Sequence, residues 1–182
     1  MLKTITMVLS NRGLKKAIKQ LDEYQDALDK GVKRGIELAT QIAYRKVIEN
    51  CNEGNLGAFT DAIKWEYNKK TNTGKVYVKS EGYNQNNGVV SDGMVIIINE
   101  FGSGIEGSAT GYARQHGYEI NMSKKGAIGW AFPTKDGEYR WTHGIPSKLM
   151  FYFAYEDIKR ELGKYVNVSI DGTIGKLYEK QE

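Results

Sequence analysis

The stretch LKKAIKQLDEYQDALDKGVKRGIELATQIAYRKV, residues 14–47, decides the fold of this chain. Its apolar residues recur at steps of three, four or seven, which keeps one face of a helix apolar. These residues are Leu14, Ile18, Leu21, Leu28, Val32, Ile36, Ala39, Ala43 and Val47. Ser10 and Asn11 offer capping side chains before the stretch, and a Gly/Asn cluster at residues 50–57 ends it. The sequence therefore predicts one long amphipathic helix of about nine turns.

Small residues form a second stripe on the same helix, at Ala27, Gly31, Gly35, Ala39 and Ala43. A glycine inside a helix costs up to about 1 kcal/mol relative to alanine. Two explanations stay open at this point. Either the sheet or a neighbouring subunit packs closely against the stripe, or tertiary packing simply tolerates the glycines.

The segments that follow the helix have the period of two that is typical of strands. Residues 62–68 and 74–79 alternate on either side of a polar turn and predict a β-hairpin. Residues 94–99 (MVIIIN) form a continuous apolar run, which predicts a central strand buried on both faces. Residues 128–132 and 138–142 predict two further strands. A shorter one is expected at the N-terminus, in residues 2–9.

The C-terminal third predicts a helix and then a hairpin. The helix is expected over residues 146–162, with Pro146 in its first turn. Residues 165–178 alternate around an Asp-Gly pair and predict a terminal β-hairpin. We expect an α+β fold, a twisted antiparallel β-sheet packed against one long N-terminal helix and a second C-terminal helix.

The glycines gather in the middle of the chain and predict a long loop. Residues 103–126 are rich in glycine and small polar residues and have little periodicity. A structureless connection of this length is usually functional or mobile. We expect a mobile glycine-rich loop there, within a single domain over residues 1–178 and before a frayed tail at 179–182.

The composition indicates a soluble protein made in a cytosol. The 182 residues carry a net charge of +4, with basic residues interspersed among acids, which favours a mixed solvated surface over a nucleic-acid stripe. Cys51 is the single cysteine, so we expect neither an intramolecular disulfide nor a Cys-rich metal site. No apolar stretch approaches the roughly 20 residues that span a bilayer. Residues 1–9 alternate instead of forming an apolar block, so we expect no signal peptide.

The residue types that carry catalysis are not arranged for it. His116 and His143 are the only histidines and have no metal-ligand spacing. Gly102, Gly104 and Gly107 have the spacing of a dinucleotide-binding loop, but no apolar-periodic helix follows them to hold a pyrophosphate. We therefore expect no enzyme, no metal and no cofactor.

The order of the motifs carries more information than any one of them. The long helix is followed by GNLG (54–57), a Val/Ile run leading into NEFGSG (99–104), a glycine-rich stretch, GWAFP (129–133) and WTHGIPSK (141–148). This order resembles the head–tail joining, or tail-completion (neck), protein family of long-tailed double-stranded DNA phages and prophages. The chain departs from the family pattern at Ser103, where threonine is usual, and at residues 148–151, where Arg-Pro-Phe-Met is common.

The resemblance implies a virion structural protein without catalysis. It implies a homo-oligomeric ring, often hexameric in the family, between a head-side adaptor or connector and the tail tube or terminator. DNA would meet it only by passing through the lumen, and the protein would reside in the host cytoplasm until assembly. The candidate subunit-interface or structural-turn residues are Glu100, Phe101, Gly102, Gly104, Trp130, Trp141, Gly144 and Pro146.

Two other functions stay open. A tail terminator or minor tail protein has a similar architecture and would differ in its binding partners. A DNA-binding accessory protein is compatible with the pI of about 8.9 and would have a salt-dependent affinity for DNA.

Overall fold

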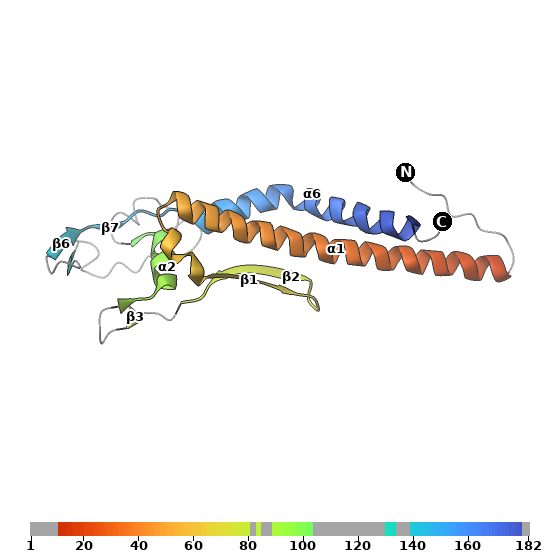
Figure 1. Ribbon diagram of the computed structural model, residues 1–182, viewed down its shortest axis with the longest axis horizontal. Helices are drawn as coiled ribbons and strands as arrows, with labels where there is room; N and C mark the ends of the chain where they lie inside the picture. The colour runs from red at the N-terminus through yellow and green to blue at the C-terminus, as the bar shows by residue number, and fades with distance from the viewer. Residues whose placement is uncertain (1–10, 81–82, 85–88, 104–129, 134–138, 180–182) are drawn as a thin grey trace. The chain divides into compact units, whose positions relative to one another are not determined.

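The computed structural model describes residues 11–80, 83–84, 89–103, 130–133 and 139–179 (Figure 1). These residues fall into two compact units, which we describe separately. The first unit comprises residues 11–42, 66–75 and 158–179, and the second comprises residues 43–65 and the described part of 76–157.

Four elements contribute residues to both units. They are the helices α1 (Asn11–Glu53) and α6 (Met150–Glu179) and the strands β1 (Ile63–Asn68) and β2 (Thr73–Val78), which pair with each other. The other elements lie in the second unit: η1 (Gly57–Ala62), β3 (Tyr83–Asn84), β4 (Val89–Val90), α2 (Asp92–Phe101), β5 (Trp130–Pro133), β6 (Tyr139–Thr142) and β7 (Gly144–Ile145).

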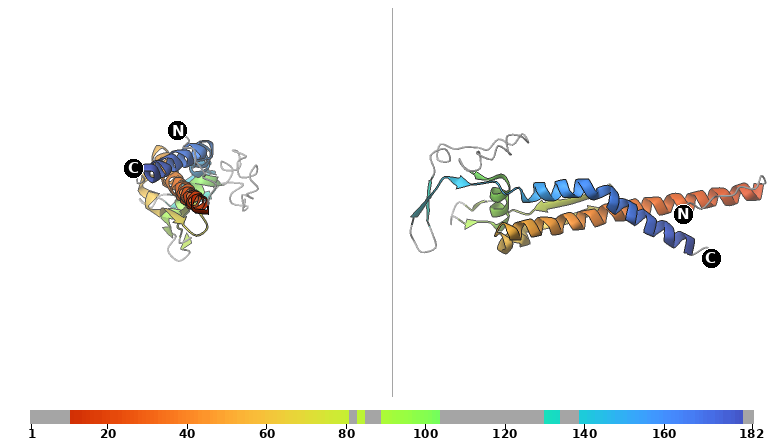
Figure 2. Two further views of the ribbon diagram at one scale, coloured as in Figure 1. Left: turned by 90° about the vertical axis from the view of Figure 1, so that its right-hand side faces the viewer. Right: turned by 90° about the horizontal axis from the view of Figure 1, so that it is seen from above.

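In the first unit, α6 packs very closely against α1. A Cβ atom added at Gly31 would lie 2.7 Å from the Cα of Ile170, and one at Gly35 would lie 2.6 Å from the Cα of Val166. The two helices therefore run antiparallel (Figure 1), and α6 crosses α1 at an angle in the right-hand view of Figure 2. The two glycines of the small-residue stripe thus have a close partner, which is a helix of the same chain.

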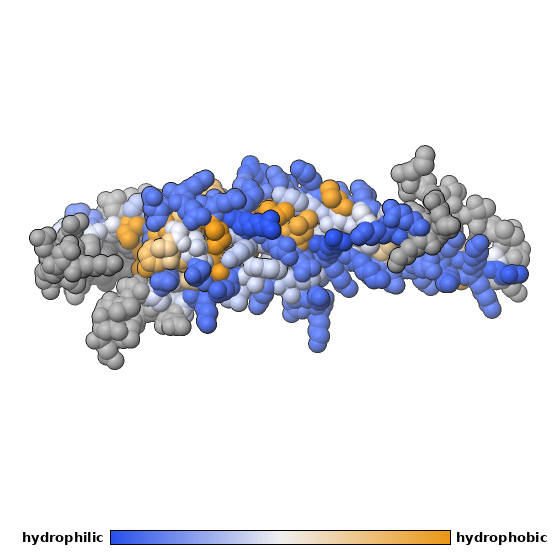
Figure 3. Space-filling model, viewed as in Figure 1, coloured by the Kyte–Doolittle hydropathy of each residue, from blue (hydrophilic) through white to orange (hydrophobic). Residues whose placement is uncertain are grey.

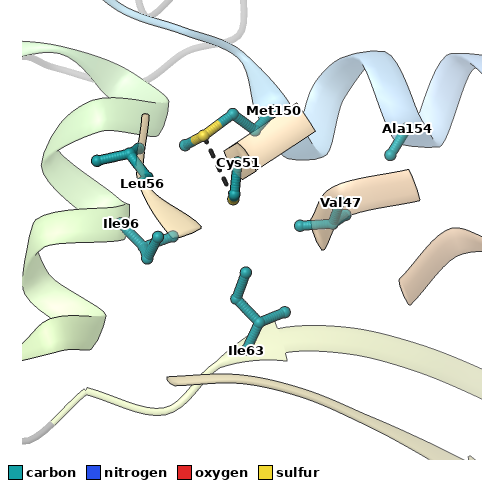
Figure 4. Close-up of a cluster of buried hydrophobic side chains, with 7 residues drawn as sticks. All are labelled: Val47, Cys51, Leu56, Ile63, Ile96, Met150 and Ala154. Atoms are coloured by element: carbon teal, nitrogen blue, oxygen red, sulfur yellow. Dashed lines mark hydrogen bonds between the residues drawn. The ribbon is translucent and has the colours of Figure 1, made fainter. Parts of the chain in front are cut away.

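In the second unit, the end of α1 packs into a hydrophobic core. The buried side chains come from four elements and the turn after α1, and Figure 4 shows them converging: Val47, Cys51, Leu56, Ile63, Ile96, Met150 and Ala154. Ile96 and Cys51 have no exposed surface at all. Since each buried aliphatic side chain of this size contributes about 1.5–3 kcal/mol, this cluster is a main source of stability for the unit.

The mixture of helices and strands, the long N-terminal helix and the first hairpin are confirmed. The described strands form three separate two-stranded sheets rather than one twisted sheet. Among them, β5 and β6 pair antiparallel, with Ala131 opposite Trp141. The predicted strand at residues 2–9 and almost all of the glycine-rich loop lie outside the described residues.

The prediction of a central strand at residues 94–99 is wrong, because these residues belong to helix α2. Ser91 caps the helix by accepting a hydrogen bond from the Met94 N–H at 3.4 Å. The buried positions Gly93, Ile96 and Glu100 lie on one helical face. A short apolar run fits a buried helix as well as a buried strand, and the capping residue decides here in favour of the helix.

The terminal hairpin at residues 165–178 is also wrong, because α6 continues without interruption to Glu179. Its β-branched residues Val166 and Ile170 make the close contacts with α1 described above. Tertiary packing therefore overrides a local preference for strand. None of the described helices combines the length and the apolarity that crossing a bilayer requires.

Candidate functional site: the Glu100 junction

Several of the residues singled out from the sequence meet where α2 ends and α6 begins, in the second unit. We call the contact between residues 99–103 and residues 144–152 the Glu100 junction. Glu100 is only 6% exposed. Its Oε2 accepts a hydrogen bond from the Phe151 N–H at 2.9 Å, and its Oε1 accepts one from the Tyr152 N–H at 3.1 Å. One buried carboxylate thus caps the first turn of α6, where a helix leaves N–H groups unpaired and favours negative charge.

Two further hydrogen bonds to backbone carbonyls reinforce this cap. The Lys148 N–H donates to the Asn99 carbonyl at 2.7 Å, and the Ser147 hydroxyl donates to the Glu100 carbonyl at 2.5 Å. Leu149, between these residues and the helix, has a φ of 55°. A branched side chain in this left-handed region is strained, so the surrounding contacts must hold the backbone in this conformation.

The glycines of the two motifs permit the turns that bring the chain segments together. Gly102 follows the last residue of α2 with a φ of 78°, a conformation that favours glycine at the end of a helix. It therefore allows an exit from a helix, not from the expected strand. Gly144 has a φ of 115°. Next to these glycines, Ser103 and Ile145 form an antiparallel bridge, and the Ile145 N–H donates to the Ser103 Oγ at 3.2 Å.

The end of α1 completes the junction through residues that the sequence analysis did not select. The Asn50 amide donates to the Met150 carbonyl at 2.8 Å, and the Lys148 ammonium donates to the Gly54 carbonyl at 2.6 Å. The Cys51 thiol lies 3.4 Å from the Met150 sulfur. Asn50 and Gly54 belong to the Gly/Asn cluster that was predicted to end the helix, and nothing in that cluster indicates which distant carbonyl or ammonium group it meets.

Burial controls the chemistry of both titratable groups at this site. Removal from water raises the pKa of Glu100, and hydrogen bonds from the N–H groups of Phe151, Tyr152 and Met150 lower it in part. Burial and the nearby Glu100 carboxylate raise the pKa of the Cys51 thiol to about 11, against a smaller lowering by Lys148. The thiol is therefore protonated at neutral pH and is not activated as a nucleophile. Both oxygens of Glu100 accept hydrogen bonds from the first turn of α6, which is a structural role for this carboxylate.

The remaining candidate residues take different positions. Phe101 is the last residue of α2 and is half-buried, whereas Pro146 is exposed in the segment before α6. Trp141, in β6, is 59% exposed. Its ring packs edge to face with that of His143, with 6.4 Å between the two ring centroids. Trp130 lies in β5, opposite Thr142 in the register. Gly104 is outside the described residues. The structure thus joins Glu100, Phe101 and Gly102 to the segment of Gly144 and Pro146 but does not place the tryptophans there.

Within the described ranges, no group of three or more His, Cys, Asp or Glu side chains is arranged to hold a metal ion. Comparison with models of known protein families finds no match for the chain, and neither curated proteins nor solved structures match it.

Proposed function

We propose that this chain is a structural component of the neck of a long-tailed phage or prophage particle. In this role it forms part of the ring that joins the DNA-filled head to the tail. Copies of the chain surround the path of the DNA, between a head-side adaptor and the tail tube or terminator. The protein acts by shape and is incorporated into the virion from the host cytoplasm.

The observation that carries the proposal is the Glu100 junction. Two of the motifs on which the family resemblance rests are separated by about 40 residues in the sequence, and they are joined by the Glu100 cap and the Ser103–Ile145 bridge. Their residue types have a shared structural reason, because the acid caps a helix and the glycines turn the chain. This supports reading them as parts of one inherited architecture rather than as unrelated coincidences of sequence.

Two exposed aromatic residues of the second unit, Trp141 and Phe153, are suited to contacts with protein neighbours. Trp141 is 59% exposed and Phe153, in the first turn of α6, is 53% exposed. Large aromatic side chains are enriched at protein interfaces, where they bury much apolar area at little entropic cost. We assign these two residues to contacts with adjoining neck components.

Disruption of the gene in the virus that encodes the chain tests the proposal directly. Electron microscopy of the resulting lysate is expected to show DNA-filled heads and separate tails, and supply of the wild-type protein is expected to restore joined particles. Normal particles in the absence of the protein would contradict the proposal. Empty heads would indicate a role before DNA packaging is complete, and abnormally long tails would indicate a tail terminator instead.

Substitution of the exposed aromatics tests the assigned surface. Trp141→Ala combined with Phe153→Ala is expected to leave the circular dichroism spectrum and melting temperature nearly unchanged, since exposed residues contribute little to folding. The same variant is expected to complement the disrupted gene at least tenfold less well. Val168→Ala is the matched control, because Val168 is an apolar residue of α6 that is 62% exposed and lies in the other unit. Full complementation by the aromatic variant would remove this surface from the proposal.

A further inference from the structure

The N-terminal end of α1 presents an apolar stripe to solvent. Leu14, Ile18 and Leu21 are 47%, 51% and 54% exposed and lie on one face, at steps of four and three. The close contacts of α6 with α1 lie further along α1, at Gly31 and Gly35, and beyond them the end of α6 diverges from α1 in the right-hand view of Figure 2. α1 continues beyond that end of α6 in both views (Figures 1 and 2). The described part of α6 therefore does not cover this stripe.

A stripe of charged residues lies beside the apolar stripe, one position further along the chain at each step. Its first two members are basic, Lys15 and Lys19, and the next three are acidic, Asp22, Asp26 and Asp29. All five residues are exposed. The hydrophilic character of this end of α1 is visible on the face drawn in Figure 3. The charged stripe is thus divided into a basic part and an acidic part that meet near Gln20.

We propose that this end of α1 binds the same segment of a second copy of the chain, in an antiparallel two-helix contact with its two-fold axis near Gln20. The apolar stripes of the two copies face each other, as in a coiled coil. The basic part of each charged stripe then lies against the acidic part of the other.

The arrangement of charges selects this orientation. In an antiparallel pair, the flank on one side of the apolar stripe meets the same flank of the partner. The Lys15–Lys19 part of each copy therefore meets the Asp22–Asp29 part of the other, twice in one contact. In a parallel pair, that flank meets the opposite one, which carries Ala17, Gln20 and Tyr24 and has no charge to offer. Such complementarity favours the antiparallel orientation, because only that orientation pairs opposite charges.

This contact is independent of the proposed function. A two-fold contact ends at two copies, because both copies bury the same surface in it and neither keeps that surface for a third copy. It therefore cannot by itself build a ring, and it describes how two copies associate in solution.

Reversing the charges of the charged stripe provides the sharpest test of the two-helix contact. One variant carries Lys15→Glu and Lys19→Glu, which makes the stripe wholly acidic. The other carries Asp22→Lys, Asp26→Lys and Asp29→Lys, which makes it wholly basic. Sedimentation equilibrium is expected to show a dimer for the wild type and at least a tenfold weaker self-association for each variant. An equimolar mixture of the two variants is expected to restore the dimer. Failure of the mixture to associate while both variants keep their helical content would overturn the proposal.

Cross-linking tests the orientation. A short bis-maleimide is expected to join Lys15→Cys to Asp26→Cys when the two single variants are mixed, and to join neither variant efficiently to itself. The native Cys51 does not compete, because its side chain has no exposed surface. Failure of the mixed variants to cross-link under conditions in which the protein is dimeric would contradict the antiparallel orientation.

Sedimentation equilibrium also distinguishes two other possible occupants of the apolar stripe. If the first residues of this chain cover the stripe, the full chain is monomeric and a variant lacking residues 2–9 becomes dimeric. If a different protein covers it, both forms are monomeric over the whole concentration range. Either result would contradict the proposal that a second copy covers the stripe. Neither result depends on whether the chain joins heads to tails.

Discussion

Residues 150–157 of α6 differ from residues 158–179 in what holds them helical. The first segment lies in the second unit and is fixed by specific polar contacts. Glu100 caps its first turn, and Lys46 donates to Asp157 at 2.9 Å. Met150 and Ala154 are each 1% exposed. Its sequence also favours a helix, so local preference and tertiary contacts agree.

The second segment has a sequence that favours strands and turns. It contains β-branched residues at alternate positions and three glycines, Gly163, Gly172 and Gly175. In the first unit, the close packing of this segment against Gly31 and Gly35 of α1 opposes this preference. The comparison teaches that one continuous helix can depend on capping at one end and on close packing at the other. The following predictions separate these two dependences.

The largest effect is expected from filling the space at the two α1 glycines. In the variant Gly31→Ala with Gly35→Ala, each new Cβ meets a Cα atom of α6 at less than 3 Å. Backbone cannot yield as a side chain can, so each site is expected to cost about 1–3 kcal/mol. This exceeds the roughly 1 kcal/mol that alanine gains over glycine in a helix.

Urea unfolding followed by circular dichroism measures this loss, and hydrogen exchange locates it. Faster exchange is expected in residues 158–179, with little change in residues 150–157. Uniform protection along α6 in the double variant would show that close packing against α1 is not what keeps the second segment helical.

The next largest effect is expected at the cap. Glu100→Gln replaces one accepting oxygen with a donor, so one N–H of Phe151 or Tyr152 loses its partner. A buried donor without a partner costs about 1–3 kcal/mol. Exchange is expected to increase at residues 150–157 rather than at the C-terminal end of α6. Asp92→Asn, at an exposed acid of α2, is the control and is expected to change stability little.

The pH dependence of stability follows from the same residue. Burial raises the pKa of Glu100 in the folded state above its ordinary value of 4.5, so the folded protein binds this proton more tightly than the unfolded chain does. By linkage, the resulting stabilisation is complete below the ordinary value and is lost as the pH rises through the folded-state pKa. Glu100→Gln is expected to remove this contribution in urea titrations at successive pH values. An unchanged pH profile in the variant would assign the dependence to other groups.

The sequence predicted those elements in which periodicity and local preference agree. The long helix was found because its apolar face is regular. α2 was mistaken for a strand because the run MVIIIN is too short for periodicity to decide. The signal that could have corrected it was Ser91 followed by Asp92, a capping residue and an acid in the first turn.

The candidate site was predicted only in part. The family resemblance selected Glu100, Gly102 and Gly144, which the structure brings into one junction. The hydrogen bonds that the N–H groups of Phe151 and Tyr152 donate to Glu100 could not be predicted, because they depend on how segments about 50 residues apart pack. No local pattern records such a tertiary contact.

The smallest effect, and one of opposite sign, is expected at the glycines of the second segment. Positions 172 and 175 have open space where a Cβ would lie. In a helix, Gly172→Ala and Gly175→Ala are therefore each expected to stabilise the protein by about 0.5–1 kcal/mol. In a hairpin with its turn at Asp171 and Gly172, Gly172→Ala would destabilise, because such turns require a positive φ that alanine disfavours. The sign of the change in the midpoint of urea unfolding therefore decides between the two conformations that this sequence can support. A destabilised Gly172→Ala variant would mean that packing against Gly31 and Gly35 does not outweigh the local preference for a hairpin.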